Sequence, residues 1–307
     1  MRYVEEFRER LERIFGDRAE DVYRYLLEGR PPTYVRVNTL KADVEEVVEN
    51  LETAGVELAE TPLSYAFRVL SSPGPLGSSL EHVAGYLYLQ DLASMVPPEL
   101  LDPEPPGPVI DLCAAPGSKT TQLAQLLGGE GVVLAVDADP RRVRALVHNV
   151  NRLGCVNVIV AHADAARLRI SAPFLLLDPP CSGEGTLHRD PHALRTWTPK
   201  KPGRFARTQL RLLRAALRML PPGGRLVYST CTFSVEENEL VIHEALGNDD
   251  RYRIVPSVPR WLEPHTVPGL TEWEGRELRE DLRHAFRIDP ASLESDGFFV
   301  AVIERRH

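Results

Sequence analysis

Acidic and thiol side chains stand at the ends of five predicted strands in this chain. The strands are the largely apolar segments 108–113, 131–139, 156–164, 173–180 and 224–232. Ligands of open α/β sheets bind beyond the carboxyl ends of the strands. Those ends carry Asp111, Cys113, Asp137, Asp139, Asp164, Asp178, Cys181 and Cys231. We therefore expect a binding and catalytic site along this edge of the sheet.

Two thiols and one carboxylate in this set are suited to covalent catalysis. Cys181 lies in the segment DPPCSG, which begins with Asp178, and Cys231 lies in the segment STCT. If the two preceding strands are neighbours, their backbones lie about 5 Å apart and both thiols face one cleft. The spacing of the residues leaves open which thiol takes which role.

Methylation at carbon 5 of a pyrimidine requires such a set of groups. A thiolate that adds to carbon 6 activates carbon 5 toward a methyl donor, and a second group then helps to remove the carbon 5 proton. Asp178 would stabilise the adduct by supplying a proton at ring nitrogen 3. Methylation of an amino group is disfavoured, because such an enzyme would carry an aromatic residue in place of Cys181. Cys113 and Cys155 are expected to pack as small apolar residues.

The segment AAPGSKTT after the first of these strands favours an adenosine-containing cofactor. Its small residues and glycine open a helix, which lets backbone amides approach a ligand closely. It matches neither the P-loop nor the GxGxxG pattern, which disfavours a nicotinamide dinucleotide. Asp137 suits a ribose diol and Asp164 suits an adenine amino group. Each acid alone could be a helix cap, but the series at successive strand ends favours S-adenosylmethionine.

The elements that position these residues predict an α/β fold of the Rossmann-like methyltransferase type. Near-continuous apolar strands alternate with helices at 118–127, 140–153 and 204–220, which is typical of a parallel sheet covered on both faces. Two further strands, 284–290 and 297–306, are expected to add an antiparallel edge.

The region before residue 108 predicts a separate small α/β unit. Residues 1–30 are expected to be helical, and a strand, a helix and a strand follow at 33–41, 42–56 and 65–70. Pro- and Gly-rich breaks near 73–77 and 102–108 divide the chain. We expect three parts: an N-terminal region at 1–75, a connecting segment at 76–107 and a methyltransferase domain at 108–307.

Composition excludes several classes of protein. Of the 307 residues, 43% are hydrophobic and 26% are charged, which excludes a disordered or fibrous chain. The charged start, and the lack of a run of about 18 apolar residues, predict no secretory signal and no membrane span. The four cysteines form no CxxC pair, so we expect free thiols and no metal site. We expect a cytoplasmic monomer.

The charges are unevenly distributed along the chain, whose net charge is -8. Residues 187–225, here called the basic segment, carry a local charge of +9, which leaves -17 on the rest. Its ten basic groups, against the single acid Asp190, are Arg189, Arg195, Lys200, Lys201, Arg204, Arg207, Arg211, Arg214, Arg218 and Arg225. Such a segment can contact phosphates even on an acidic protein, although a solvated helix face would look the same.

Four segments resemble the signature blocks of the Nop/Sun family of RNA (cytosine-5) methyltransferases. They are DLCAAPGSKTTQLAQLL, LLLDPPCSGEGTLHRDP, LRMLPPGGRLVYSTCTFSVEENE and DGFFVAVIERR. Two upstream segments, VRVNTLKADVEE and GYLYLQDLASMVPPELL, are also similar, so the resemblance spans roughly residues 30–307. The compact layout is most similar to the archaeal tRNA branch of the family.

The resemblance implies a role for each candidate residue. It makes Cys231 the nucleophile and Cys181 the residue that assists product release, whereas DNA cytosine methyltransferases use the cysteine at the position of Cys181. It implies an RNA-recognition-like N-terminal fold. The implied cofactor contacts are Cys113, Ala114, Ala115, Pro116, Gly117, Ser118, Lys119, Asp137, Arg142, Asp164 and Asp178. Ser118 departs from the second glycine that is common in the family, but serine is small enough to be tolerated there.

The leading hypothesis is therefore methylation of cytosine in RNA. A base inside a helix cannot be reached from a cleft, so the target base must be unpaired or flipped out. The substrate expected from the resemblance is tRNA, with ribosomal RNA as the alternative. A methyltransferase fold that acts mainly as an RNA assembly factor is a second hypothesis, disfavoured because a scaffold needs neither thiol. A DNA cytosine methyltransferase is disfavoured by the STCT segment.

Overall fold

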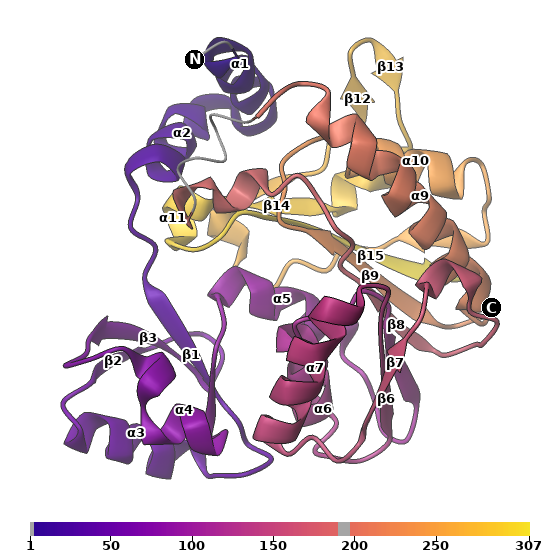
Figure 1. Cartoon of the computed structure of the whole chain (residues 1–307). Helices are drawn as coiled ribbons and strands as arrows, with labels where there is room; N and C mark the ends of the chain where they lie inside the picture. Colours follow the sequence, from indigo (N-terminus) through magenta and orange to yellow (C-terminus); the bar gives the residue numbers. More distant parts are fainter. Residues whose placement is uncertain (1–2, 190–196) are drawn as a thin grey trace. The chain divides into compact units, whose positions relative to one another are not determined.

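The computed structural model describes residues 3–189 and 197–307, which form two compact units (Figure 1). Unit I comprises residues 32–165, and unit II comprises residues 1–31 together with 166–307. Strands alternate with helices in both units, so the predicted α/β class is confirmed.

Unit I begins with a four-stranded antiparallel sheet in the order β2-β3-β1-β4. Its strands are β1 (Thr33–Val37), β2 (Glu57–Glu60), β3 (Ala66–Ser71) and β4 (Leu87–Leu89). Helix α3 (Val44–Thr53) starts at Asp43, whose side chain accepts a hydrogen bond from the Glu45 amide. The helix lies against the sheet (Figure 1). Its Val47 and Leu51 share a buried cluster with Val35 and Val37 of β1. The predicted strand, helix and strand are confirmed, and the short strands β2 and β4 were not anticipated.

The rest of unit I carries three parallel strands in the order β5-β6-β7. They are β5 (Pro108–Asp111), β6 (Val132–Asp137) and β7 (Val158–His162). Helix α6 (Ser118–Leu126) follows β5 and helix α7 (Pro140–Leu153) follows β6, as predicted. Before them lie η2 (Leu76–Ser78), α4 (Leu80–Ala84) and α5 (Leu92–Leu101).

Unit II is built on strands in the order β11-β14-β15-β9-β8, with β10 also pairing with β15. Strands β8 (Phe174–Leu177) and β9 (Arg225–Thr230) are parallel neighbours, as the placement of the thiols required. Strand β15 (Phe298–Arg305) pairs antiparallel with β9 and with β14 (Phe286–Ile288), so the predicted antiparallel strands are confirmed. Strands β10 (Tyr252–Ile254) and β11 (Thr266–Pro268) extend this region.

Helices of unit II come from both ends of its sequence. Helices α9 (Lys201–Met219) and α10 (Glu239–Leu246) lie side by side (Figure 1). The predicted N-terminal helix is divided into α1 (Val4–Phe15), η1 (Gly16–Arg18) and α2 (Ala19–Glu28), because Gly16 has a positive φ of 56°. Phe15 of α1 packs edge-on against Phe233, with ring centroids 5.0 Å apart.

Short elements complete the fold. They are η3 (Ala165–Arg167), η4 (Glu184–Arg189), η5 (Glu263–His265), β12 (Glu272–Trp273), β13 (Arg276–Glu277), η6 (Glu280–His284) and α11 (Pro290–Leu293). Within residues 3–189 and 197–307, none of the helices combines the length and the apolar character that crossing a bilayer requires.

Candidate active site

Two cysteine thiols of unit II lie in direct contact. The residues that follow β8 and β9 leave the sheet at the same edge, because the two strands are parallel and Leu177 is paired with Tyr228. This arrangement brings Cys181 Sγ to 3.1 Å from Cys231 Sγ. Both side chains are only partly buried. The structure thus brings together the two thiols that the sequence placed at neighbouring strand ends.

The protonation of Cys181 depends on its neighbours. The hydrogen bond to Cys231, together with burial and the negative charges of Glu237 and Asp178, raises the pKa of Cys181 well above its ordinary value. Asp178, at the end of β8, accepts a hydrogen bond of 3.2 Å from Ser229 Oγ. Cys181 therefore keeps its proton near neutral pH and can share it with the Cys231 sulfur.

Buried polar residues that the sequence did not single out surround the thiols. Glu237 is fully buried and accepts hydrogen bonds from Ser182 N at 2.9 Å and from Gln209 Nε2 at 2.8 Å. Burial raises the pKa of Glu237 to about 7 against these hydrogen bonds. Asn238, also buried, follows it in the chain. Their place in the segment VEENE, six and seven residues after Cys231, was the available signal.

The turn at residues 113–119 lies in unit I and runs from the end of β5 into the first turn of α6. Gly117 precedes the helix with a φ of 108°, and a Cβ atom there would lie 3.0 Å from Leu146 Cδ1. Glycine is therefore needed for both conformation and space. No side chain caps the first turn of α6, so its amides can face a ligand. The backbone of this turn has the form that the cofactor hypothesis requires.

Asp137 and Arg142 hold the turn in place. The two carboxylate oxygens of Asp137 accept hydrogen bonds from Ala115 N at 3.1 Å and from Asp139 N at 2.9 Å. Arg142 donates to the Ala115 carbonyl and lies 3.6 Å from the Asp137 carboxylate. Asp137 is thus oriented by the backbone, and its role toward a ribose stays a prediction.

The remaining candidates of unit I differ in exposure. Lys119 is buried and Asp164 is half-buried beyond the end of β7. Cys113 is half-buried, whereas Cys155 is buried, as expected, and burial raises the pKa of Cys155 to about 11. Within the described residues, no group of three or more His, Cys, Asp or Glu side chains is placed to hold a metal ion.

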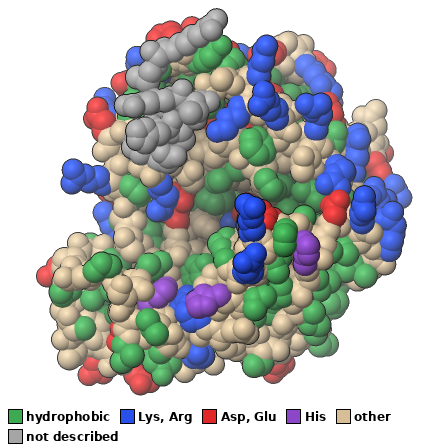
Figure 2. Space-filling model, in the orientation of Figure 1, with side chains coloured by type: hydrophobic (Ala, Val, Ile, Leu, Met, Phe, Trp, Pro, Cys, Tyr) green, Lys and Arg blue, Asp and Glu red, His purple; other side chains and the backbone are tan. Residues whose placement is uncertain are grey.

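The basic segment forms an arginine stripe on α9. The stripe comprises the five exposed arginines Arg204, Arg207, Arg211, Arg214 and Arg218. Their spacing of three and four residues places them on one side of the helix, opposite buried residues such as Leu213 and Ala216. Basic side chains gather over this helix in the space-filling view (Figure 2). Asp190 and Arg195 lie outside the described residues.

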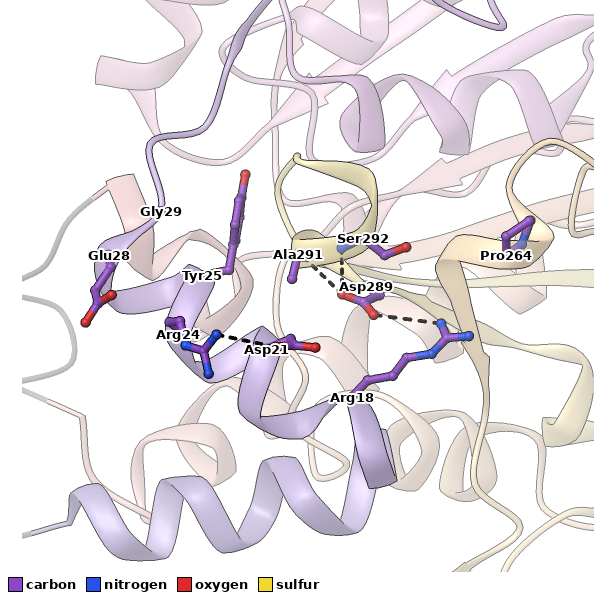
Figure 3. A pocket seen from close by; sticks show the side chains of 10 residues that line it. All are labelled: Arg18, Asp21, Arg24, Tyr25, Glu28, Gly29, Pro264, Asp289, Ala291 and Ser292. Carbon is purple, nitrogen blue, oxygen red and sulfur yellow. Dashed lines mark hydrogen bonds and ion pairs between the residues drawn. The ribbon is translucent and has the colours of Figure 1, made fainter.

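A cavity of about 690 Å³ in unit II lies between α2, η5 and α11 (Figure 3). Four of the charged side chains that line it already interact with other groups of the protein. Asp289 accepts hydrogen bonds from the amides of Ala291 and Ser292, at 3.0 and 3.1 Å, and lies 3.7 Å from Arg18. Arg24 lies 3.7 Å from Asp21. These contacts give the cavity a structural explanation, and we assign it no ligand.

Two family models match the chain. Residues 98–304 match the model described as 16S rRNA methyltransferase RsmB/F, and residues 7–76 match the ferredoxin-like domain described as RsmF/B-like. The chain is similar to the tRNA (cytosine(49)-C(5))-methyltransferase of Pyrococcus abyssi, with 35% identity over 99% of both chains. It is 37% identical to ribosomal RNA small subunit methyltransferase F of Cronobacter sakazakii, over 88% of this chain but only 56% of that protein.

Solved structures agree with these matches. A methyltransferase homolog from Pyrococcus horikoshii is 37% identical, with a TM-score of 0.85 over 99% of this chain and 96% of the other. NSun6 from Pyrococcus horikoshii, solved with SFG, is 25% identical, with a TM-score of 0.82 over 98% and 97%. The matched model covers more than half of the chain, and the resemblance of the sequence blocks is confirmed. This chain belongs to the RsmB/F (Nop/Sun) family of methyltransferases.

Proposed function

We propose that this chain transfers a methyl group from S-adenosylmethionine to carbon 5 of cytosine in RNA. The observation that carries the proposal is the 3.1 Å contact between the Cys181 and Cys231 sulfur atoms, beside the carboxylate of Asp178 at the end of the adjacent strand. Methylation at carbon 5 requires one thiol to add to carbon 6 of the base. A second group must then remove the carbon 5 proton so that the first thiol is released.

Cys231 acts as the nucleophile in this proposal, and its Sγ atom forms a bond to carbon 6 of the cytosine. Asp178 takes up the proton that Cys231 loses and supplies it at ring nitrogen 3, which stabilises the negative charge that builds up on the ring, and takes it back when the adduct breaks. After methylation, Cys181 gives its own proton to water and, as a thiolate, accepts the carbon 5 proton. The electron pair of that C–H bond restores the double bond between carbons 5 and 6, and the bond to Cys231 breaks.

The raised pKa of Cys181 suits this second step. A thiol with a high pKa yields a strongly basic thiolate, which accepts a proton from carbon more readily than an ordinary thiolate does. The same hydrogen bond, donated by the Cys181 thiol, stabilises the Cys231 sulfur as a thiolate before it attacks the base. The two cysteines therefore share a hydrogen bond in the resting enzyme and act in sequence during turnover.

The residues of unit I fit the proposed cofactor. The Gly117 turn and the uncapped first turn of α6 offer backbone amides, and Asp137 stands at the end of β6. We propose that residues 113–119, Asp137, Arg142, Asp164 and Asp178 hold the cofactor. When bound, S-adenosylmethionine would supply an electrophilic methyl group to carbon 5 of the base.

Transfer RNA is the substrate that we favour. The chain spans 99% of the archaeal relative named for tRNA, but only 56% of the bacterial relative named for ribosomal RNA. The arginine stripe on α9 would contact the RNA phosphates, so binding should weaken as salt rises. We propose a monomer that acts in the cytoplasm and has no need of a metal. The residues 1–75, 76–107 and 108–307 would serve as RNA-recognition-like region, connector and methyltransferase domain.

Methyl transfer to defined RNAs tests this proposal. The purified chain is incubated with methyl-labelled S-adenosylmethionine and either a tRNA transcript, a small-subunit ribosomal RNA transcript or duplex DNA, and the nucleosides are identified by mass spectrometry. We expect 5-methylcytidine in tRNA, and none with Cys231→Ala. Label in ribosomal RNA alone would favour that alternative substrate, and label in DNA would favour a DNA methyltransferase. An RNA that binds without being labelled would favour an assembly factor.

A further inference from the structure

Two consecutive buried residues, Glu237 and Asn238, each contact the loop of one catalytic cysteine. We propose that they are positioning residues, with Glu237 holding the Cys181 loop and Asn238 holding the Cys231 loop. The inference rests on the proposed function and extends it, because it assigns the two steps of the reaction to separate supports. Neither residue is part of the thiol and carboxylate set described above.

The side chains of Glu237 and Gln209, here called the Glu237 arm, contact the chain on both sides of Cys181. Glu237 Oε2 accepts a hydrogen bond of 2.9 Å from the amide of Ser182, the residue after the cysteine. Gln209 Nε2 donates to Glu237 Oε2 at 2.8 Å and to the carbonyl of Pro180, the residue before the cysteine, at 2.9 Å. The backbone at Cys181 is thus fixed before and after its side chain, through residues of α9 and of the segment preceding α10.

The side chains of Asn238 and Thr230, here called the Asn238 arm, contact the chain on both sides of Cys231. Asn238 Oδ1 accepts a hydrogen bond of 2.6 Å from Thr230 Oγ1, on the residue before the cysteine. Asn238 Nδ2 donates to the carbonyl of Thr232, the residue after the cysteine, at 2.9 Å. All of the side chains in this arm are fully buried, so water does not compete for these bonds.

The two arms are joined. Tyr228 of β9 donates a hydrogen bond of 2.6 Å from its hydroxyl to the Glu237 carbonyl, which connects the strand before Cys231 to the Glu237 arm. The hydroxyl groups of Ser182 and Thr232 lie 2.7 Å apart, which connects the residues that follow the two cysteines. Because Glu237 and Asn238 are neighbours in the chain, a single short segment determines the separation of the two sulfur atoms.

Glu237 has a feature that packing alone does not require. Its Oε1 atom is buried and has no hydrogen-bond partner within the described residues, and a buried carboxylate without full pairing is costly. Leucine or methionine would fill the space without this cost. The carboxylate is explained if its Oε2 atom must accept both the Ser182 amide and the Gln209 side chain.

Loss of each arm should impair a different step. Misplacing a reacting group by about 1 Å can cost roughly 100-fold in rate. Glu237→Ala frees the Cys181 loop, so the covalent bond to RNA should form but break slowly. Asn238→Ala frees the Cys231 loop, so the covalent bond should form slowly and should not accumulate.

The experiment measures both steps on the full-length chain with tRNA and S-adenosylmethionine. Covalent RNA adduct is read on a denaturing gel, and turnover is read from 5-methylcytidine. For Glu237→Ala we expect adduct to accumulate while turnover falls about 10- to 100-fold. For Asn238→Ala we expect adduct formation and turnover to fall together. Glu237→Gln keeps an oxygen acceptor, so its turnover should be at least about tenfold faster than that of Glu237→Ala.

Matched variants keep the test decisive. Glu236→Gln changes the preceding acid, which contacts Arg10 and Ser234 instead, and should behave like the wild type. If either alanine variant does not fold, Gln209→Ala tests the Glu237 arm and Thr230→Val tests the Asn238 arm, with the same contrast expected. Equal defects in both arms, or no adduct with the Glu237 arm disrupted, would overturn the inference. A wild-type chain that methylates no RNA would overturn the proposed function itself.

Discussion

Cys181 Sγ lies 3.1 Å from Cys231 Sγ although the two residues are 50 positions apart in the chain. The contact follows from the pairing of β8 with β9, which ends both strands at one edge of the sheet. Two thiols in contact can share a proton, and either sulfur can reach a base placed beside the pair. The chemistry of the proposed reaction therefore depends on strand pairing as much as on the cysteines themselves.

Removal of each thiol should have a different effect. Cys231→Ala should lower the rate of methylation by about 10³-fold or more, because no other group can form the bond to carbon 6. Cys181→Ala should instead accumulate a covalent RNA adduct that survives denaturing electrophoresis. The double variant should form no adduct. Adduct in Cys231→Ala and none in Cys181→Ala would reverse the two roles.

Mild oxidation should inactivate the enzyme reversibly. The two thiols would lose two electrons and two protons to diamide, which becomes the hydrazide, and a disulfide would form between them. Activity should disappear and return with dithiothreitol, and peptide mapping without reductant should find residue 181 linked to residue 231. Cys155 is buried and serves as an internal control that stays reduced. Persistent activity after oxidation would mean that the sulfur atoms are not in contact in solution.

The arginine stripe should account for part of the salt dependence of RNA binding. Replacing Arg207 or Arg204 by Ala should weaken binding severalfold, and each substitution should reduce the slope of log K against log salt by about 1. Arg253→Ala removes an exposed arginine that pairs with Glu304 and is a matched control. Binding measured by fluorescence anisotropy at several salt concentrations checks the slopes. Equal slopes for wild type and stripe variants would exclude a phosphate contact at α9.

Gly117→Ala should weaken cofactor binding. Alanine would have to adopt a φ of 108° and place its Cβ atom 3.0 Å from Leu146 Cδ1, at a strain of about 1–3 kcal/mol. If the cofactor binds only to the strained conformation of the turn, the binding free energy falls by that amount, and the Kd for S-adenosylmethionine rises roughly 5- to 150-fold. Gly128→Ala, with a φ of 61° and open space around it, is the control for strain alone. Calorimetric titration distinguishes the two, and equal Kd values would remove the turn from the cofactor site.

The carboxyl group of Glu237 should make folding stability depend on pH. Its pKa is about 7 in the folded chain, above the ordinary value of 4.5, so the folded state binds this proton more tightly. The resulting stabilisation is complete below pH 4.5 and is lost as the pH rises through about 7. Relative to Glu237→Gln, the wild type should therefore lose about 3 kcal/mol over this window. Urea unfolding of both proteins at several pH values checks the difference, which should be constant above pH 8.

The amino-acid sequence by itself determined the order of elements and the residues at their ends. Apolar strands, the small turn after β5 and the segments DPPCSG and STCT are local patterns, and each carries its own chemical meaning. The sequence blocks also identified the family. The basic segment was also visible in the sequence from its charge alone, whereas the stripe that its arginines form on α9 was recognised in the structure.

Only the tertiary structure decided which distant side chains meet. An amphipathic helix shows which face is buried but not what covers it, so the packing of α1 against Phe233 could not be predicted. The contacts of Glu237, Asn238 and Gln209 with the cysteine loops also depend on the register of β8 with β9 and on the position of α9. Hydrogen-bond partners depend on distances within a few tenths of an ångström, which arise from long-range packing and leave no periodic trace in the sequence.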